Sequence, residues 1–317
     1  MISRRQLRIK ALQSLYAYYK TGREDMGRSE KELHFNIEKA YELYHYLLLL
    51  VIDVILYAES RIELARNKRI PTPEDLNPIT RFIDNRLIDQ LRNNEQLLRY
   101  VDQHKLNWAN YPELIKEVYS KLVESEEYIA YMSVEEGSYA EDKKIISYIY
   151  THVVFPSEML SSIMEEQSIF WNDDLEFITS MIIKTIKKFK GEDDSGKPLM
   201  VLYKNEEDRD YVVNLYRQTI IHREEYLEYI KHNTRNWDLE RIAFMDILIM
   251  QMAIAELIGF PSIPTKVSLN EYLEISKFYS TSKSSVFING VLDKVVYQLK
   301  EEKKIVKMGR GLIGEND

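Results

Sequence analysis

Three arginines near the start of the chain, Arg4, Arg5 and Arg8, are the residues whose type and spacing most directly indicate chemistry. No acidic residue appears before Glu24, whereas six basic residues precede it, in a chain whose formal net charge is −8. A local cluster of this kind suits phosphate or another anion. Stability does not explain the cluster, because cations at a helix N-terminus oppose the helix dipole. Two interpretations are open at this point: an anion-binding surface, or a basic turn that is solvated or forms internal ion pairs.

Patterns typical of catalysis are absent from the sequence. The chain has no cysteine, which excludes disulfides, thiol nucleophiles and cysteine-based zinc sites. Its six histidines show no metal-ligand spacing such as H-E-x-x-H. Residues 191–198, G-E-D-D-S-G-K-P, have the spacing of a phosphate-binding loop, but Pro198 replaces the hydroxyl that would bind magnesium and three acids would repel phosphate. We therefore expect no enzyme activity, no cofactor and no metal.

The elements that position the arginines are predicted to be helices. The 317 residues include only ten glycines and eight prolines, and no segment shows sustained period-two alternation, so we expect an all-α fold. Ser3 is the predicted N-cap of a helix over 3–20, whose apolar stripe includes Leu12 and Leu15. Further helical segments are predicted at about 30–69, 80–105, 112–131, 141–190, 206–231 and 238–257.

The segment 238–257 is expected to form the central helix of its bundle, because Asp246 is its only charge between Arg241 and Glu256. Asp238 is its predicted N-cap. After it, residues 264–295 predict two helices joined by a polar turn at 280–285. Ser268 and Glu271 have the spacing of a capping box, which predicts that the first of these helices begins at Ser268.

Two strings in this last segment resemble one family. The run K-V-S-L-N-E at 266–271, followed by F-I-N-G-V-L-D-K at 287–294, is similar to the C-terminal signature of the NusB family of bacterial transcription antitermination factors. At the other end of the chain, R-R-x-x-R-x-x-A-L-Q-x-L-Y, from Arg4 to Tyr16, resembles the arginine-rich first helix of that family. The resemblance leaves much of the chain unaccounted for.

The resemblance implies a NusB-like helical bundle interrupted by an insertion. The NusB-like core is assigned to 1–24 and 206–300, an inserted all-helical region to 25–205, and a basic flexible tail to 301–317. Segments 30–63 and 144–190 have similar helical patterns, which suggests that the insertion is a degenerate internal repeat.

The resemblance also implies a function. Members of the family bind single-stranded boxA-type RNA together with the ribosomal protein NusE, within the transcription elongation complex, and promote processive transcription of ribosomal RNA operons. Cationic side chains combined with aromatic rings suit single-stranded RNA. Glu256 is assigned to the side that binds the protein partner. The implied RNA contacts are Arg4, Arg5, Arg8, Gln13, Tyr16, Phe287 and Asn289.

The chain departs from the family at Gln251, Ala255 and Val286, where an arginine, an aromatic residue and a lysine are common. One alternative is a structural helical adaptor that has lost RNA binding. Another is an accessory module of a ribosomal RNA methyltransferase, which the lack of a cysteine nucleophile and a glycine-rich cofactor loop disfavours. The first twenty residues show no signal sequence, so we expect a cytoplasmic protein.

Overall fold

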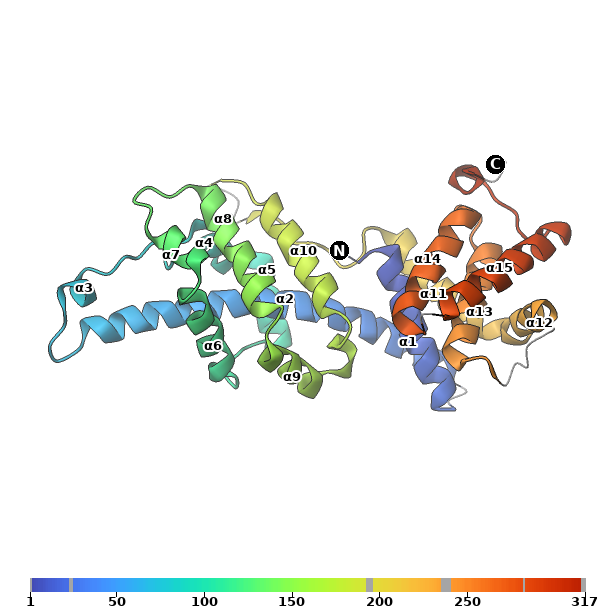
Figure 1. The fold of residues 1–317 in the computed structure, drawn as a ribbon, viewed down its shortest axis with the longest axis horizontal. Helices are drawn as coiled ribbons and strands as arrows, with labels where there is room; N and C mark the ends of the chain where they lie inside the picture. Colours follow the sequence, from blue (N-terminus) through green and yellow to red (C-terminus); the bar gives the residue numbers. More distant parts are fainter. Residues whose placement is uncertain (1, 23–24, 192–195, 235–240, 282, 315–317) are drawn as a thin grey trace. The chain divides into compact units, whose positions relative to one another are not determined.

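The computed structural model describes residues 2–22, 25–191, 196–234, 241–281 and 283–314. Within these ranges all regular secondary structure is helical, with no strand, so the all-α prediction is confirmed (Figure 1). The chain divides into two compact units. Unit 1 comprises Met1–Ile37 and Tyr203–Asp317, and unit 2 comprises Glu38–Leu202.

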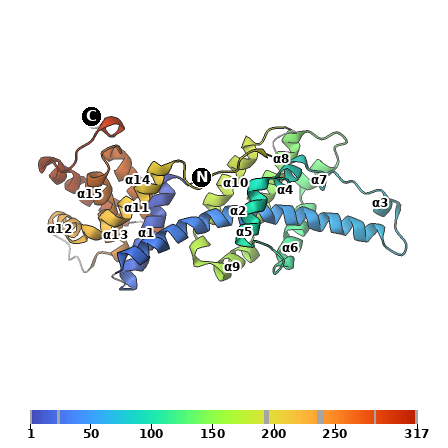
Figure 2. The same cartoon turned by 180° about the vertical axis from the view of Figure 1, so that it is seen from behind.

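Unit 1 is a bundle around α13, which packs against α1, α11, α12, α14 and α15 (Figures 1 and 2). Its central position confirms the prediction made from its nearly uncharged sequence. The helix begins at Phe244, with Ala243 at the N-cap, and the proposed cap Asp238 lies outside the described residues. The helices of this unit are α1 (Arg4–Lys20), the first turns of α2 (Met26–Arg66), α11 (Glu206–Ile221), α12 (Arg223–Asn233), α13 (Phe244–Gly259), α14 (Thr265–Tyr279) and α15 (Ser284–Glu301).

Local signals predict the start of α1 correctly and that of α14 incorrectly. Ser3 is the N-cap of α1, and its hydroxyl accepts a hydrogen bond from the Gln6 amide at 3.3 Å. The predicted capping box at Ser268 and Glu271 is wrong, because α14 already begins at Thr265. Both side chains instead contact other helices: the Ser268 hydroxyl donates to Glu256 at 2.7 Å, and Glu271 accepts from Arg5 at 2.8 Å. A tertiary hydrogen bond of Ser268 and a tertiary ion pair of Glu271 thus replace the local cap.

Residues 301–317 are predicted to be a basic flexible tail, and within the described part of this segment Lys307 and Gly311 lie against the end of α13 and the residues after it. The ammonium group of Lys307 donates to the carbonyl of Leu257 at 3.0 Å, near the end of α13. A Cβ added to Gly311 would lie 1.9 Å from the carbonyl oxygen of Pro261, so only glycine allows this approach. Lysine is well suited to such a position, because it satisfies the unpaired carbonyls that end a helix. Residues 315–317 lie outside the described residues.

Unit 2 is built around the long helix α2, whose buried face runs from Leu43 to Ala58. Three buried aromatic side chains form hydrogen bonds between α2 and other segments of unit 2. Tyr44 bonds to Thr185, Tyr150 to the Leu47 carbonyl, and Trp108 to the Tyr46 carbonyl. The predicted helical segments at 80–105, 112–131 and 141–190 are each divided into two or more helices. The elements are α3 (Pro73–Leu76), α4 (Arg86–Arg92), α5 (Glu95–His104), α6 (Pro112–Val123), α7 (Glu126–Met132), α8 (Tyr139–Tyr148), the π-helix η1 (Ile149–Val154), α9 (Glu158–Gln167), the 3₁₀ turn η2 (Ile169–Trp171) and α10 (Leu175–Lys188).

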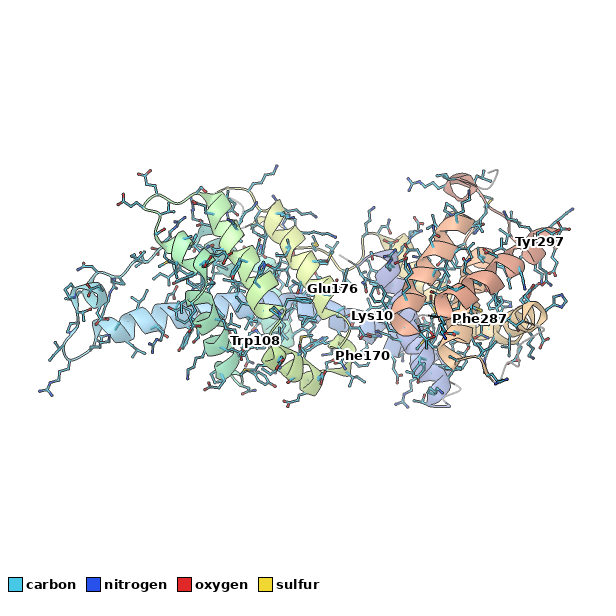
Figure 3. The ribbon with its side chains drawn as sticks, viewed as in Figure 1. Lys10, Trp108, Phe170, Glu176, Phe287 and Tyr297 are labelled. Atoms are coloured by element: carbon cyan, nitrogen blue, oxygen red, sulfur yellow. The ribbon has the colours of Figure 1, made fainter. Side chains whose placement is uncertain are left out.

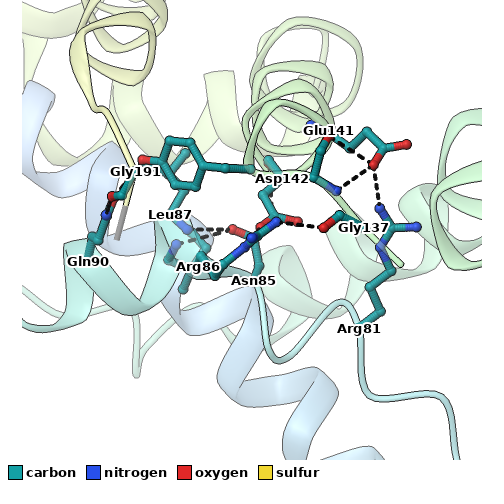
Figure 4. A network of polar contacts seen from close by, with 12 residues as sticks. Arg81, Asn85, Arg86, Leu87, Gln90, Gly137, Glu141, Asp142 and Gly191 are labelled. Carbon is teal, nitrogen blue, oxygen red and sulfur yellow. Dashed lines mark hydrogen bonds and ion pairs between the residues drawn. The ribbon is translucent and has the colours of Figure 1, made fainter. Parts of the chain in front are cut away.

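A polar network joins α4 to α8 within unit 2 (Figure 4). The Asn85 side chain caps α4 and donates to the Asp142 carbonyl at 3.2 Å, while Arg86 pairs with the Asp142 carboxylate at 2.7 Å. Arg86 also donates to the carbonyl of Gly137 at 3.0 Å. A Cβ at Gly137 would lie 2.5 Å from the Arg81 guanidinium, so glycine lets the arginine lie against the loop. The α7–α8 connection is therefore held by specific contacts.

Candidate functional site

The first turns of α1 carry ion pairs to other helices of unit 1. Arg4 pairs with Asp208 at 2.9 Å and with Glu207 at 2.5 Å, both on α11. Arg5 forms a bidentate pair with Glu271 of α14, with both distances at 2.8 Å. The Arg5 side chain is nevertheless 46% exposed. Of the two interpretations left open by the sequence, internal ion pairing therefore describes the basic cluster in this structure.

Arg8 lies inside the bundle and is paired with Glu256 of α13. Its Nε and Nη2 atoms each donate to the Glu256 carboxylate at 2.7 Å. The two side chains are 3% and 0% exposed. The carboxylate also accepts hydrogen bonds from the hydroxyls of Tyr211 at 2.5 Å, Ser268 at 2.7 Å and Tyr272 at 3.1 Å. Five donors thus surround one buried carboxylate.

The electrostatics of this cluster keep Glu256 ionised. Burial alone would raise the pKa of its carboxyl, but the positive charge and hydrogen bonds of Arg8, with those of Tyr211 and Ser268, hold that pKa below its usual value. Burial raises the pKa of Tyr211 and Tyr272 well above the ordinary value, so both phenols stay protonated and donate. A buried pair of this quality is strongly destabilised when one partner is removed.

Two predicted contacts are therefore corrected. Arg8 was assigned to RNA and Glu256 to a protein partner, but neither side chain reaches the surface of unit 1. The physical reason is their mutual pairing, because a guanidinium can be buried when a carboxylate neutralises it and satisfies its donors. We assign both residues to the stability of the bundle.

Helices α1 and α14 run parallel beside each other. Arg5 contacts Glu271 and Gln13 contacts Tyr279, and the two pairs have the same sequence separation of 266 residues. The Gln13 amide donates to the Tyr279 hydroxyl at 3.2 Å and accepts from Asn36 at 3.3 Å. Gln13 is half-buried, so it both links three helices and presents part of its side chain to solvent.

An aromatic and cationic cluster lies at the C-terminal end of α1. Tyr16 is 39% exposed, and its ring centroid lies 5.8 Å from that of Phe244, at the start of α13. The Lys20 ammonium lies 5.7 Å from the Tyr16 ring centroid and 4.8 Å from that of Phe244. Nearby, the Arg223 guanidinium lies 4.7 Å from the Tyr19 ring centroid. Exposed rings beside cations are the combination that single-stranded nucleic acids stack on.

The sequence indicated only part of this cluster. The family resemblance implies Tyr16 as an RNA contact, but it does not imply Lys20 or Phe244. Lys20 lies one turn after Tyr16 on the same helix, so i, i+4 spacing could have found it. Phe244 comes from a helix more than 200 residues later, and nothing in the local pattern relates it to Tyr16.

Phe287 and Asn289 lie on the first turns of α15, where Figure 3 labels Phe287. Both side chains are partly exposed, and the Asn289 amide donates to Asp293 at 3.1 Å. Among the departures from the family pattern, Gln251 and Ala255 are buried in α13, whereas Val286 is 76% exposed. Gln251 and Ala255 therefore affect the packing of α13. At position 286 the exposed surface of α15 carries a valine in place of the lysine that is common in the family.

The described residues contain no group of three or more histidine, aspartate or glutamate side chains arranged to hold a metal ion. In the same part of the chain, no helix combines the length and the apolar character needed to cross a membrane.

Comparison with known proteins places the similarity mainly in the C-terminal third. Residues 175–297 match the NusB family. Proteins named transcription antitermination protein NusB are 42% identical over 106 residues in Salinibacter ruber, 38% over 105 in Chloroherpeton thalassium and 38% over 104 in Natranaerobius thermophilus. These matches cover 33%, 33% and 31% of this chain and 66%, 50% and 75% of the three relatives. No solved structure matches the chain.

Proposed function

This chain belongs to the NusB family, and we propose that it is a non-catalytic transcription antitermination factor. In this proposal it binds single-stranded boxA-type RNA together with the ribosomal protein NusE, within the transcription elongation complex, and promotes processive transcription of ribosomal RNA operons. The observation that carries the proposal is the 38–42% identity to three proteins named for this activity. We propose residues 1–24 and 206–300 as the NusB-like core and 25–205 as the inserted region, although the family match already begins at residue 175. The internal repeat stays a prediction.

The proposed RNA surface centres on Gln13 and Tyr16, with Lys20 and Phe244 beside them. Tyr16 offers a partly exposed ring for base stacking, and Lys20 offers a cation for phosphate. Phe287 and Asn289 remain proposed contacts on α15. Because Glu256 is buried, a NusE surface on this chain would use other residues.

Arg4 and Arg5 are proposed as secondary phosphate contacts. Each is already paired with an acid, so RNA binding would exchange a carboxylate for a phosphate at the same guanidinium. Because the existing ion pair must first be broken, part of the free energy gained from the phosphate is offset. We therefore expect these two arginines to contribute less than unpaired cations would.

Replacing Tyr16 by alanine is expected to weaken binding of a boxA-like single-stranded RNA by about 1–3 kcal/mol, because a stacking surface is lost. The dependence of affinity on salt should hardly change, since no charge is removed. Tyr297→Ala is the matched control, because Tyr297 is a 70% exposed tyrosine on α15 outside the proposed surface. Equal losses in the two variants, or none in Tyr16→Ala, would reject the stacking role.

Arg5→Ala is expected to lower the slope of log affinity against log salt by about 0.7, the value for one lost phosphate contact on a single strand. Arg217→Ala is a close control, since Arg217 also forms a bidentate surface pair, with Glu30 at 2.7 Å, and is 45% exposed. If both variants keep the slope of the parent protein, Arg5 does not touch phosphate.

The function as a whole is tested by titrating boxA-like RNA with the protein in the presence and absence of the cognate NusE. We expect NusE to increase the affinity for this RNA and a scrambled RNA of equal length to bind more weakly. Absence of binding under both conditions would favour the adaptor that has lost RNA binding.

A further inference from the structure

A groove of about 400 Å³ lies between α7 and α8 in unit 2. These two helices pack against each other (Figure 1). The residues that line the groove recur at intervals of three and four along both helices, so the groove runs lengthwise between them. They include Glu126, Ala130 and Val134 from α7 and the turn after it, and Glu141, Ile145 and Tyr148 from α8.

The groove has an apolar lining that is partly open to solvent. Ala130 is exposed and Val134 is 39% exposed. Tyr131 and Ile145 line the same groove and are buried. Exposed apolar surface beside a cavity gains free energy when another apolar group covers it. The groove therefore offers a place for an aliphatic side chain.

The surface around the groove is strongly acidic. Residues 122–142 contain seven aspartate and glutamate residues and no lysine or arginine. Two of the acids are neutralised within unit 2, because Glu141 pairs with Arg81 and Asp142 pairs with Arg86. The other five form no ion pair with any residue that the structure describes; they are Glu124, Glu126, Glu127, Glu135 and Glu136.

One cation, Lys144, lines the groove together with Glu126, Glu127 and Glu141. Because Glu141 already has an arginine partner, Lys144 can offset only one of the two remaining carboxylates. A net negative charge is therefore left in the groove, and the unpaired glutamates before and after α7 add to it. Such a surface attracts cations.

The walls of the groove are held in place by contacts of the chain itself. Arg81 donates to the carbonyls of Tyr131 and Val134, the second at 3.2 Å, and pairs with Glu141 at 3.1 Å (Figure 4). Its guanidinium lies 4.1 Å from the centroid of the Tyr131 ring. One arginine thus joins the end of α7 to the start of α8. A groove that is formed before binding spares the complex the cost of ordering it.

Several ligand classes do not suit this groove. Its carboxylates would repel the phosphates of RNA and of anionic lipids. In the part of the chain that the structure describes, no three acids or histidines are arranged to hold a metal ion. A neutral apolar ligand would cover the apolar lining but would leave the glutamates without counter-charges.

We propose that the α7–α8 groove docks a short cationic segment of a partner protein. An aliphatic side chain of that segment covers Ala130 and Ile145, and flanking lysine or arginine side chains pair with Glu126 and Glu127. Charge complementarity selects this occupant, because a segment of this kind neutralises the acids and covers the apolar lining together. The site lies outside the family match at residues 175–297, so it gives the inserted region a binding role of its own.

The length of α7 limits the size of the docked segment. The helix has seven residues and spans about 10 Å, which is the length of about three extended residues. The shortest suitable sequence is therefore an aliphatic residue with a cationic residue on each side.

Fluorescence anisotropy with the full chain and a labelled peptide Lys-Lys-Leu-Lys-Lys tests the proposal. We expect binding at low ionic strength that weakens as salt is added, since the glutamates are exposed to solvent. The peptide Lys-Lys-Ser-Lys-Lys should bind several-fold more weakly, and Glu-Glu-Leu-Glu-Glu should not bind. Absence of binding by the first peptide, or equal affinity for the leucine and serine peptides, overturns the proposal.

Two charge variants locate the binding site. Glu126→Gln combined with Glu127→Gln should weaken binding of the Lys-Lys-Leu-Lys-Lys peptide at least several-fold. Glu165→Gln combined with Glu166→Gln is the matched control, because these are also adjacent exposed glutamates that pair with no described residue, and they lie on α9. Both double variants change the net charge equally, so equal losses would mean a general electrostatic attraction and would reject the groove.

A steric variant tests the apolar part of the site. Ala130→Trp should fill the groove and abolish binding of the leucine peptide, whereas Ala17→Trp, at an exposed alanine of α1 in unit 1, should leave it intact. Both alanines are exposed, so the melting temperature should hardly change. In the parent protein, the methyl NMR signal of Ile145 should shift when the peptide is added, while that of Ile163, a buried isoleucine on α9, should not. The opposite pattern, or unchanged binding by Ala130→Trp, would place the peptide elsewhere and overturn the proposal.

Discussion

Replacing Arg8 by alanine is expected to destabilise unit 1 by about 3–5 kcal/mol, because Glu256 would remain buried without its counter-charge. The five hydrogen bonds on this carboxylate come from side chains of α1, α11 and α14, so the loss would loosen several helix contacts together. Urea unfolding followed by circular dichroism measures the free energy. Hydrogen exchange in α1, α13 and α14 shows whether the loss is local to unit 1.

Arg5→Ala is the control for this effect. Arg5 makes an equally well-formed bidentate pair, but it is 46% exposed, and exposed pairs contribute only about 0–1 kcal/mol. Arg8→Met combined with Glu256→Gln should cost less than the sum of the two single changes, because the buried charge is then gone. A loss below about 1 kcal/mol for Arg8→Ala would contradict the role assigned to the pair.

Lowering the pH from 7.5 to 4.5 is expected to destabilise unit 2 by about 2.5 kcal/mol through His45. This side chain is fully buried, and burial lowers its pKa from 6.5 to about 4. The unfolded histidine therefore binds a proton below pH 6.5 that the folded one does not bind until about pH 4. Stability is accordingly present at neutral pH, falls as the pH drops through this window, and falls no further below it.

His45→Phe isolates this contribution. A phenyl ring keeps the stacked contact with Tyr100, whose centroid lies 3.8 Å from that of the imidazole. It also removes the buried Nε2 atom, which has no hydrogen-bond partner among the described residues. Asp53 acts in the opposite direction, because its raised pKa makes stability fall as the pH rises toward 6. The difference between parent and variant cancels that contribution. Urea titrations at both pH values supply the measurement, and parallel profiles for the two proteins would contradict the assignment.

Features that depend on a few neighbouring residues could be predicted from the amino-acid sequence alone. Ser3 and the apolar stripe through Leu12 and Leu15 predicted α1 and its first residue. The scarcity of charge between Arg241 and Glu256 predicted that α13 is central. The strings at 266–271 and 287–294 indicated the family. Periodicity and caps act within one or two helical turns, so one sequence is enough to read them.

Which arginines are buried depends on contacts between helices that are far apart in the sequence. Arg8 and Glu256 are 248 residues apart, and Arg5 and Glu271 are 266 apart, so no local pattern pairs them. The same long-range contacts removed the predicted capping box, because Glu271 pairs with Arg5 and not with the backbone of its own helix. The free energy of a charged side chain depends on which helices pack around it, since burial is unfavourable without a partner and tolerable with one. For that reason the three arginines of the first helix, for which the sequence leaves open an anion-binding surface or internal ion pairs, form internal ion pairs in the folded chain.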